Sequence, residues 1–144
     1  MITVNEVMST QVITLQATDN VFMARELMKE KEVRHIPIVD ANNFPIGIIT
    51  QRDILRAQDS ELMDNNQQKL DSKSILLEDI MSTEISYTRP KDPLRSAGLK
   101  LQKNKYGCLP VMEDNQLVGI ITDSDFVDIA LNLIEQMDYS EDID

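Results

Sequence analysis

An internal duplication constrains the fold of this chain more than any other feature. The stretch at residues 47–53, Gly-Ile-Ile-Thr-Gln-Arg-Asp, returns at residues 119–125 as Gly-Ile-Ile-Thr-Asp-Ser-Asp. Residues 4–53 align with residues 77–125 at an offset of 73, which becomes 72 after a deletion near Asn43. The other identical pairs are Met8 and Met81, Ser9 and Ser82, Thr10 and Thr83, Asp19 and Asp92, Ala24 and Ala97, and Pro37 and Pro110. Such a tandem repeat predicts two copies of one supersecondary unit.

Each copy is predicted to run strand, helix, strand, strand, helix. In the first copy the apolar patterns favour strands at 12–15, 35–39 and 46–50, with helices beginning near Asp19 or Asn20 and near Gln51. In the second copy the strands are expected at 85–88, 109–112 and 117–122, with helices from about Pro93 and Asp123. A unit of about 55 residues buries too little apolar surface to be secure alone. The sequence therefore predicts an α+β fold with two tandem β-α-β-β-α units packed about a pseudo-two-fold axis.

Two segments fall outside the repeats. Residues 58–76 are polar and indicate an extension of the preceding helix followed by a linker, whereas residues 138–144 form an acidic tail that is expected to be solvated and frayed. The predicted organisation is repeat one at 1–57, linker at 58–76, repeat two at 77–137 and tail at 138–144.

The duplicated stretch carries a threonine and, three residues later, an aspartate. Thr50 and Thr122 stand where a strand ends and a helix begins, beside the unpaired N–H groups and positive dipole end that receive anions well. Asp53 and Asp125 lie one turn into that helix and can accept two hydrogen bonds from a vicinal diol. The same pattern is also an ordinary helix start that needs no ligand, so both interpretations stay open.

Composition excludes several functions. The chain has 144 residues and a net charge of −11, which repels nucleic acid and anionic lipid. No apolar run approaches the ~20 residues of a membrane span, and the N-terminus lacks a signal-peptide pattern, so a cytoplasmic protein is expected. One His and one Cys cannot build a zinc site. No nucleophile with a neighbouring base, no His pair and no Gly-rich phosphate loop is present, so catalysis is not expected.

Each repeat resembles a CBS (cystathionine β-synthase) domain. The resemblance is carried by Val-Met-Ser-Thr at 7–10, Val-Ile-Thr-Leu at 12–15, Val-Arg-His-Ile-Pro-Ile-Val-Asp at 33–40 and the Gly-Ile-Ile-Thr-x-x-Asp stretches. It covers residues 4 to about 57 and 77 to about 132. The family implies a paired unit, called a Bateman module, that commonly binds AMP, ADP, ATP or S-adenosylmethionine and commonly forms disc-shaped homodimers. No cofactor is implied as obligatory, although magnesium accompanies ATP.

The resemblance also implies roles for particular residues. Asp53 and Asp125 would hold ribose hydroxyls, and Thr50 and Thr122 would bond phosphate or ribose. The adenine would be flanked by backbone and apolar side chains around Thr14, Ile36, Pro37, Tyr87, Leu109 and Pro110, and Cys108 is also counted among the ligand-binding residues. We expect Arg34, His35 and Arg52 to give the first repeat most of the phosphate-facing charge. The second repeat, with Gly107 and Asp123 instead, would then suit an adenosine group with few phosphates or a magnesium-bound nucleotide.

Structural interpretations stay open beside these roles. His35 can be a satisfied strand histidine, Arg34 and Arg52 can pair with surface carboxylates, and Cys108 fits a small core position. The function expected from the sequence is a free-standing sensor that binds an adenosine-containing molecule and signals to a protein partner. The alternative is an interaction or dimerisation module whose ligand sites are vestigial.

Overall fold

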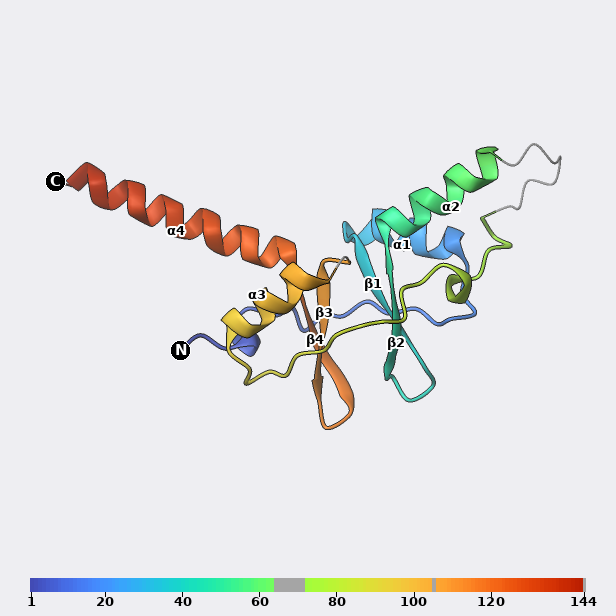
Figure 1. Cartoon of the computed structure of the whole chain (residues 1–144), viewed down its shortest axis with the longest axis horizontal. Helices are drawn as coiled ribbons and strands as arrows, with labels where there is room; N and C mark the ends of the chain where they lie inside the picture. Colours follow the sequence, from blue (N-terminus) through green and yellow to red (C-terminus); the bar gives the residue numbers. More distant parts are fainter. Residues whose placement is uncertain (64–71, 105, 144) are drawn as a thin grey trace.

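The computed structural model describes residues 1–63, 72–104 and 106–143, and it contains two similar α+β units side by side (Figure 1). Each unit holds one antiparallel hairpin, β1 with β2 or β3 with β4. The elements in chain order are η1 Val4–Glu6, α1 Val21–Lys31, β1 His35–Val39, β2 Pro45–Thr50, α2 Gln51–Met63, η2 Leu77–Asp79, α3 Leu94–Lys103, β3 Cys108–Glu113, β4 Gln116–Thr122 and α4 Asp123–Ile143. The predicted fold class is confirmed.

The two hairpins have matching registers. Ile36 lies opposite Ile49 in one, and Leu109 lies opposite Ile121 in the other. The register shifts once in each hairpin, just after Ile38 and just after Val111. The duplication seen in the sequence is therefore a duplication of backbone structure as well.

The first strand predicted for each unit is only one bridge long. Leu15 pairs in parallel with Ile38, and Thr88 pairs in parallel with Val111. The Leu15 N–H donates to the Pro37 carbonyl at 3.2 Å. To extend this parallel pairing toward the N-terminus, the backbone N–H of residue 37 would have to donate to the carbonyl of residue 13. Proline has no N–H to donate, so the pairing stops. Pro110 limits the second unit in the same way, because its carbonyl accepts from the Thr88 N–H at 3.1 Å.

The start of α1 distinguishes the two cap candidates. The Asn20 side chain accepts a hydrogen bond from the Met23 N–H at 2.9 Å, which makes Asn20 the N-cap. Asp19 instead accepts from the Gln16 N–H in the preceding turn, at 2.7 Å. The helix then buries Val21, Ala24 and Met28 against the hairpin.

The lead-in segment of each repeat packs on the other unit. Val4 is buried among the side chains of the second unit, and Leu77 is buried among those of the first. Ser9 pairs with Ile120, and the equivalent Ser82 pairs with Ile48. The boundaries at 57 and 77 therefore divide the sequence into its repeats but do not divide the structure into its packed units. Residues 1–9 pack on the second unit, and residues 75–82 pack on the first.

Gly119 lets the exchanged lead-in approach the second hairpin. A β-carbon at this position would lie 3.0 Å from the Ser9 carbonyl oxygen and 2.6 Å from the Met8 sulfur. The backbone of the lead-in cannot retreat, because Ser9 and Ile120 exchange two hydrogen bonds of 2.9 Å. The duplicated glycine is thus required for packing between the units.

The two segments outside the repeats are partly described. The helix extension is confirmed as far as Met63, whereas the predicted linker at 64–71 lies outside the described residues. The acidic tail is not frayed, since α4 continues to Ile143. No glycine or proline interrupts residues 123–143, and the Ser140 hydroxyl donates to the Gln136 carbonyl at 3.0 Å. None of the described helices has the length and apolar character that crossing a bilayer requires.

Candidate functional site

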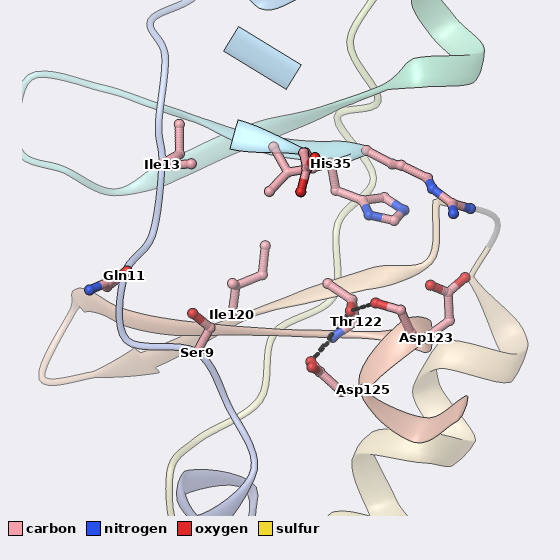
Figure 2. A pocket seen from close by; sticks show the side chains of 12 residues that line it. Ser9, Gln11, Ile13, His35, Ile120, Thr122, Asp123 and Asp125 are labelled. Carbon is pink, nitrogen blue, oxygen red and sulfur yellow. Dashed lines mark hydrogen bonds between the residues drawn. The ribbon is translucent and has the colours of Figure 1, made fainter. Parts of the chain in front are cut away.

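A cleft of about 290 Å³ lies between the two units. One wall comes from the residues before and at the start of β1, and the opposite wall from the end of β4 and the first turn of α4 (Figure 2). The lead-in segment closes one side. The lining residues are Ser9, Gln11, Ile13, Glu32, Val33, Arg34, His35, Ile120, Thr122, Asp123, Ser124 and Asp125.

The corner formed by Thr122 and Asp125 is held by its own hydrogen bonds. Asp125 Oδ2 accepts from the Thr122 N–H at 2.8 Å and from the Thr122 hydroxyl at 3.3 Å. No hydrogen bond in the described part of the chain engages Asp125 Oδ1. The carboxylate is therefore fixed through one oxygen and keeps the other for a ligand, at the N-terminus of α4 where its charge is favoured.

The corner at Thr50 and Asp53 has the same geometry. Asp53 Oδ2 accepts from the Thr50 N–H and hydroxyl, both at 2.9 Å, and the Asp53 N–H donates to the Thr50 hydroxyl oxygen at 3.2 Å. Both corners are thus the helix starts that the sequence predicts. This internal capping agrees with an ordinary helix start that needs no ligand. It also agrees with ligand binding, because the capping hydrogen bonds occupy only one oxygen of each carboxylate.

Two basic residues of the first repeat lie beside the acid of the second. Arg34 and His35 line the same cleft as Thr122 and Asp125. The sequence analysis grouped Arg34 and His35 with the first-repeat corner, and the structure also places them beside the second-repeat corner, so their role toward a ligand stays a prediction. The cause of this placement is the exchange of lead-ins and the pseudo-two-fold packing, which set the start of β1 against the end of β4.

A second cavity of about 310 Å³ adjoins the first. Its walls include Thr50 and Arg52 from the first repeat, and it shares three residues with the first cleft, Arg34, His35 and Asp123. Asp53 lies outside the walls of both cavities. The two corners are consequently unequal with respect to these two cavities, since Asp125 lines a cleft that contains Arg34 and His35 and Asp53 lines neither cavity.

Gly107 shapes the floor between these cavities. Its φ of 70° is in the left-handed region, and a β-carbon there would lie 2.7 Å from Asp123 Oδ2 and 3.0 Å from His35 Nε2. The glycine thus allows the imidazole of His35 and the carboxylate of Asp123 to come close to the same point. Asp123 is also anchored through its backbone, whose N–H donates to the Gly107 carbonyl at 2.9 Å.

The local environment lowers the pKa of His35 below its ordinary value of 6.5. Burial of the ring is the main cause, the Asp123 carboxylate acts in the opposite direction, and the Arg34 guanidinium adds to the lowering. The imidazole is therefore neutral at pH 7 in the ligand-free protein. An anion bound beside it would raise its pKa and favour the protonated, donating form.

His35 is expected to make stability depend on pH. Because its pKa is lower in the folded than in the unfolded chain, the unfolded state binds more protons below about pH 6.5, and the contribution of His35 to stability is lost as the pH falls through that range. Urea unfolding at pH 7.5, 6.5 and 5.5 should show a smaller acid-dependent loss in His35→Gln than in the wild type. Parallel profiles for the two proteins would refute this assignment.

Several predicted adenine-flanking residues lie in the core instead of the cleft. Ile36, Pro37, Leu109 and Pro110 are buried, and none of them lines either cavity. They occupy the hairpin strands, where their side chains are covered from both sides. The structure thus places these side chains in the core, and the adenine-flanking role of the backbone around them stays a prediction.

The remaining predicted residues have structural partners. Thr14 is partly buried and lies outside the walls of both cavities. The Tyr87 hydroxyl donates to the Pro45 carbonyl at 3.2 Å, and its ring packs 5.9 Å from that of Phe44, so it fastens the segment before α3 to the first hairpin. Cys108 is fully buried, and burial raises the pKa of its thiol far above the usual range, which agrees with a core role.

Seven cleft residues were not predicted from the sequence. They are Ser9, Gln11, Ile13, Glu32, Val33, Ile120 and Ser124. A usable signal existed for two of them, since Ser9 and Ile120 belong to positions that the two repeats share. The others become neighbours only through the packing between units. Among the described residues no group of three or more His, Cys, Asp and Glu side chains could hold a metal ion.

Solved structures of other proteins share this architecture. A Vibrio cholerae protein named AcuB superposes with a TM-score of 0.80 at 41% identity, over 96% of this chain and 98% of that one. The CBS domain pair of protein MJ0100, in complex with 5′-methylthioadenosine and S-adenosyl-L-methionine, gives 0.77 at 25% identity over 92% and 98%. The Arabidopsis thaliana protein CBSX2 in complex with AMP gives 0.73 at 30% identity, also over 92% and 98%.

Curated relatives are similar in sequence to this chain over only part of their own length. An uncharacterized protein of Methanocaldococcus jannaschii is 33% identical over 124 residues, which are 86% of this chain and 41% of the relative. A homoserine O-acetyltransferase of Methanohalobium evestigatum is 27% identical over 123 residues, only 23% of its length. The chain thus spans less than half of these relatives. A family model for the CBS domain matches residues 4–60 and 77–132, and the chain therefore belongs to the CBS domain family.

Proposed function

We propose that this protein is a non-catalytic regulatory module that binds an adenosine-containing small molecule, of the AMP, ADP, ATP or S-adenosylmethionine class, in the cleft between its two units. The observation that carries the proposal is the Oδ1 of Asp125, which accepts no hydrogen bond from the described residues and lies in a cleft whose opposite wall holds Arg34 and His35. A carboxylate opposite a guanidinium and an imidazole suits a ligand with a diol at one end and an anionic group at the other.

Each part of the ligand has a complementary surface. Asp125 accepts from the ribose hydroxyls, while the guanidinium of Arg34 and the imidazole of His35 face the phosphate or carboxylate end. The apolar side chains of Ile13, on the N-terminal segment, and Ile120, on β4, both line the cleft (Figure 2) and offer apolar surface for a purine ring. Asp123 adds a negative charge between the two cavities, so a magnesium-bound ATP would be accepted better than free ATP. Magnesium here belongs to the ligand, and no resident cofactor is proposed.

Related proteins of the same fold support this class of ligand. The MJ0100 pair holds 5′-methylthioadenosine and S-adenosyl-L-methionine, and CBSX2 holds AMP. The acetyltransferase activity named for some relatives is not proposed for this chain, which matches less than a quarter of those proteins.

Signalling requires a ligand that prefers one arrangement of the units. A ligand that bound all arrangements equally tightly would not shift the equilibrium between them. Because the cleft walls come from both units, a ligand that bridges Arg34 and Asp125 changes how the units sit together. We propose that a cytoplasmic protein partner recognises that change.

Calorimetric titration with AMP, ADP, ATP with magnesium, and S-adenosylmethionine tests the proposal. We expect at least one of them to bind, and Asp125→Asn to weaken it about tenfold, because a hydrogen bond to a charged group typically contributes ~1.5–3 kcal/mol. The amide can keep the Thr122 cap but presents N–H₂ where the ribose hydroxyls need an acceptor. Asp138→Asn, the same change at an exposed position of α4, should leave affinity unchanged.

Thermal unfolding in the presence of each compound gives the result that would contradict the proposal. A ligand at 100 times its dissociation constant should add ~2.7 kcal/mol to the free energy of unfolding. If none of these compounds at millimolar concentration raises the melting temperature, the alternative is favoured, an interaction module whose ligand sites are vestigial.

A further inference from the structure

Tyr106 stands at the position of the second repeat that Val33 occupies in the first. The two residues correspond at the offset of 73, and each lies just before a hairpin, Val33 before β1 and Tyr106 before β3. Val33 is partly exposed in the wall of the first cleft, whereas Tyr106 is only 9% exposed. The second repeat thus places a large aromatic side chain where the first has a small aliphatic one.

The residues equivalent to those of the first cleft are divided between two cavities around Tyr106. In the first cleft, residues 9–13 and the corner at Thr122 contribute to the walls of one space. Of their equivalents, Thr50 lines the cavity of about 310 Å³, whereas residues 82–86 line a third cavity of about 860 Å³. Among the described residues only Tyr106 is a wall of both. The tyrosine therefore stands between the two surfaces that together form the first cleft.

The ring of Tyr106 covers an apolar surface that stays open in the first cleft. Tyr106 forms a buried cluster with Ile48 and Cys108. Ile48 is fully buried, but its equivalent, Ile120, is partly exposed and lines the first cleft. A phenol ring is a flat aromatic surface, as a purine is, so the tyrosine makes the contact with isoleucine that a purine would make.

The hydroxyl of Tyr106 also engages a backbone donor. Its oxygen accepts a hydrogen bond from the Ser86 N–H at 2.6 Å. Ser86 corresponds to Ile13, whose N–H donates to none of the described residues. One side chain of the protein thus satisfies both an apolar surface and a polar group that the first cleft leaves open to a ligand.

We propose that Tyr106 takes the place of a ligand in the second cleft, so that the chain binds one adenosine-containing molecule, at Asp125, and not two. This inference rests on the proposed function, because it concerns the same class of ligand. The corner at Thr50 and Asp53 has the same capped geometry as the open one, and Arg52 in the adjoining wall supplies a cation. Removal of the ring should therefore create a second binding site.

Equilibrium dialysis with radiolabelled AMP counts the sites. The wild type should hold one AMP per chain and Tyr106→Val two, and adding Asp53→Asn to Tyr106→Val should return the number to one. Tyr106→Phe is the matched control, because it keeps the ring and loses only the hydroxyl, and it should hold one AMP. A folded Tyr106→Val that binds no more AMP than the wild type overturns the proposal, and so does a wild type that binds two.

The reciprocal change tests the same idea without altering the core. Val33→Tyr places a phenol ring at a partly exposed position of the first cleft, and it should weaken AMP binding about tenfold or more by filling the space of the purine. If Tyr106→Val does not fold, this variant decides, and unchanged affinity would overturn the proposal. If the wild type binds no AMP, the proposed function fails for this ligand, and Tyr106 is still tested, because only Tyr106→Val should then bind.

Discussion

Replacing Leu77 with alanine is expected to lower the free energy of unfolding by about 2–5 kcal/mol, the range for truncating a buried leucine. Leu77 opens the second repeat in the sequence, yet its side chain is fully buried among residues of the first unit, including Val21 and Ile36. The segment cannot move away to close the cavity, because the Leu77 N–H is hydrogen-bonded to the Asp19 carbonyl at 2.8 Å.

Urea unfolding measures this loss, and Leu133→Ala provides the control. Leu133 is 54% exposed, so the same chemical change should cost less than about 0.5 kcal/mol there. Hydrogen exchange tests the exchanged packing more specifically, because α1 amides should lose more protection than α3 amides. If the free energy of unfolding falls by less than 1 kcal/mol, or if α3 loses protection first, Leu77 does not belong to the core of the first unit.

Replacing Arg34 with alanine is expected to weaken AMP binding by about 10–100-fold and to leave adenosine binding nearly unchanged. The guanidinium lines the cleft opposite Asp125, where a bidentate, charge-assisted contact to phosphate is worth several kcal/mol before solvent competition. Arg34 is exposed, so its removal should not destabilise the fold, and the effect should decrease at high ionic strength.

Two further variants separate charge from geometry. Arg34→Lys keeps the charge without the planar fork, so it should recover only part of the affinity. Arg89→Ala removes an exposed arginine outside both cavities and should bind AMP like the wild type. Equal losses for AMP and adenosine would assign Arg34 a structural role, and unchanged AMP affinity would remove it from the site. Because Arg34 and Asp125 line one cleft, comparable losses from changing either residue are now expected.

The elements themselves could be predicted because their causes are local. Alternating apolar residues and the turns at Asp40 and Asp114 specify the hairpins, and the pattern of threonine followed by aspartate specifies the starts of α2 and α4. The first strand of each unit was overestimated, since the missing N–H groups of Pro37 and Pro110 matter only once the neighbouring segment is known.

The site was predicted in part for the same reason. Thr122 and Asp125 form a corner within four residues of chain, so their geometry follows from the sequence. Their neighbours Arg34, His35 and Ile13 are more than a whole repeat away in the sequence, and no local pattern indicates that they face this corner. The prediction grouped each corner with residues of its own repeat, whereas the cleft combines residues of both.

What the sequence alone determined is the repeated unit: its hairpin, its helices and the two capped corners, each produced by hydrogen bonds and apolar periodicity over a few residues. What only the tertiary structure decided is which corner faces a cleft with cationic walls. That choice depends on the exchange of lead-in segments, in which Val4 and Leu77 bury themselves in opposite units. The physical reason is that burial is non-directional, so an apolar segment carries no local sign of the unit that will cover it.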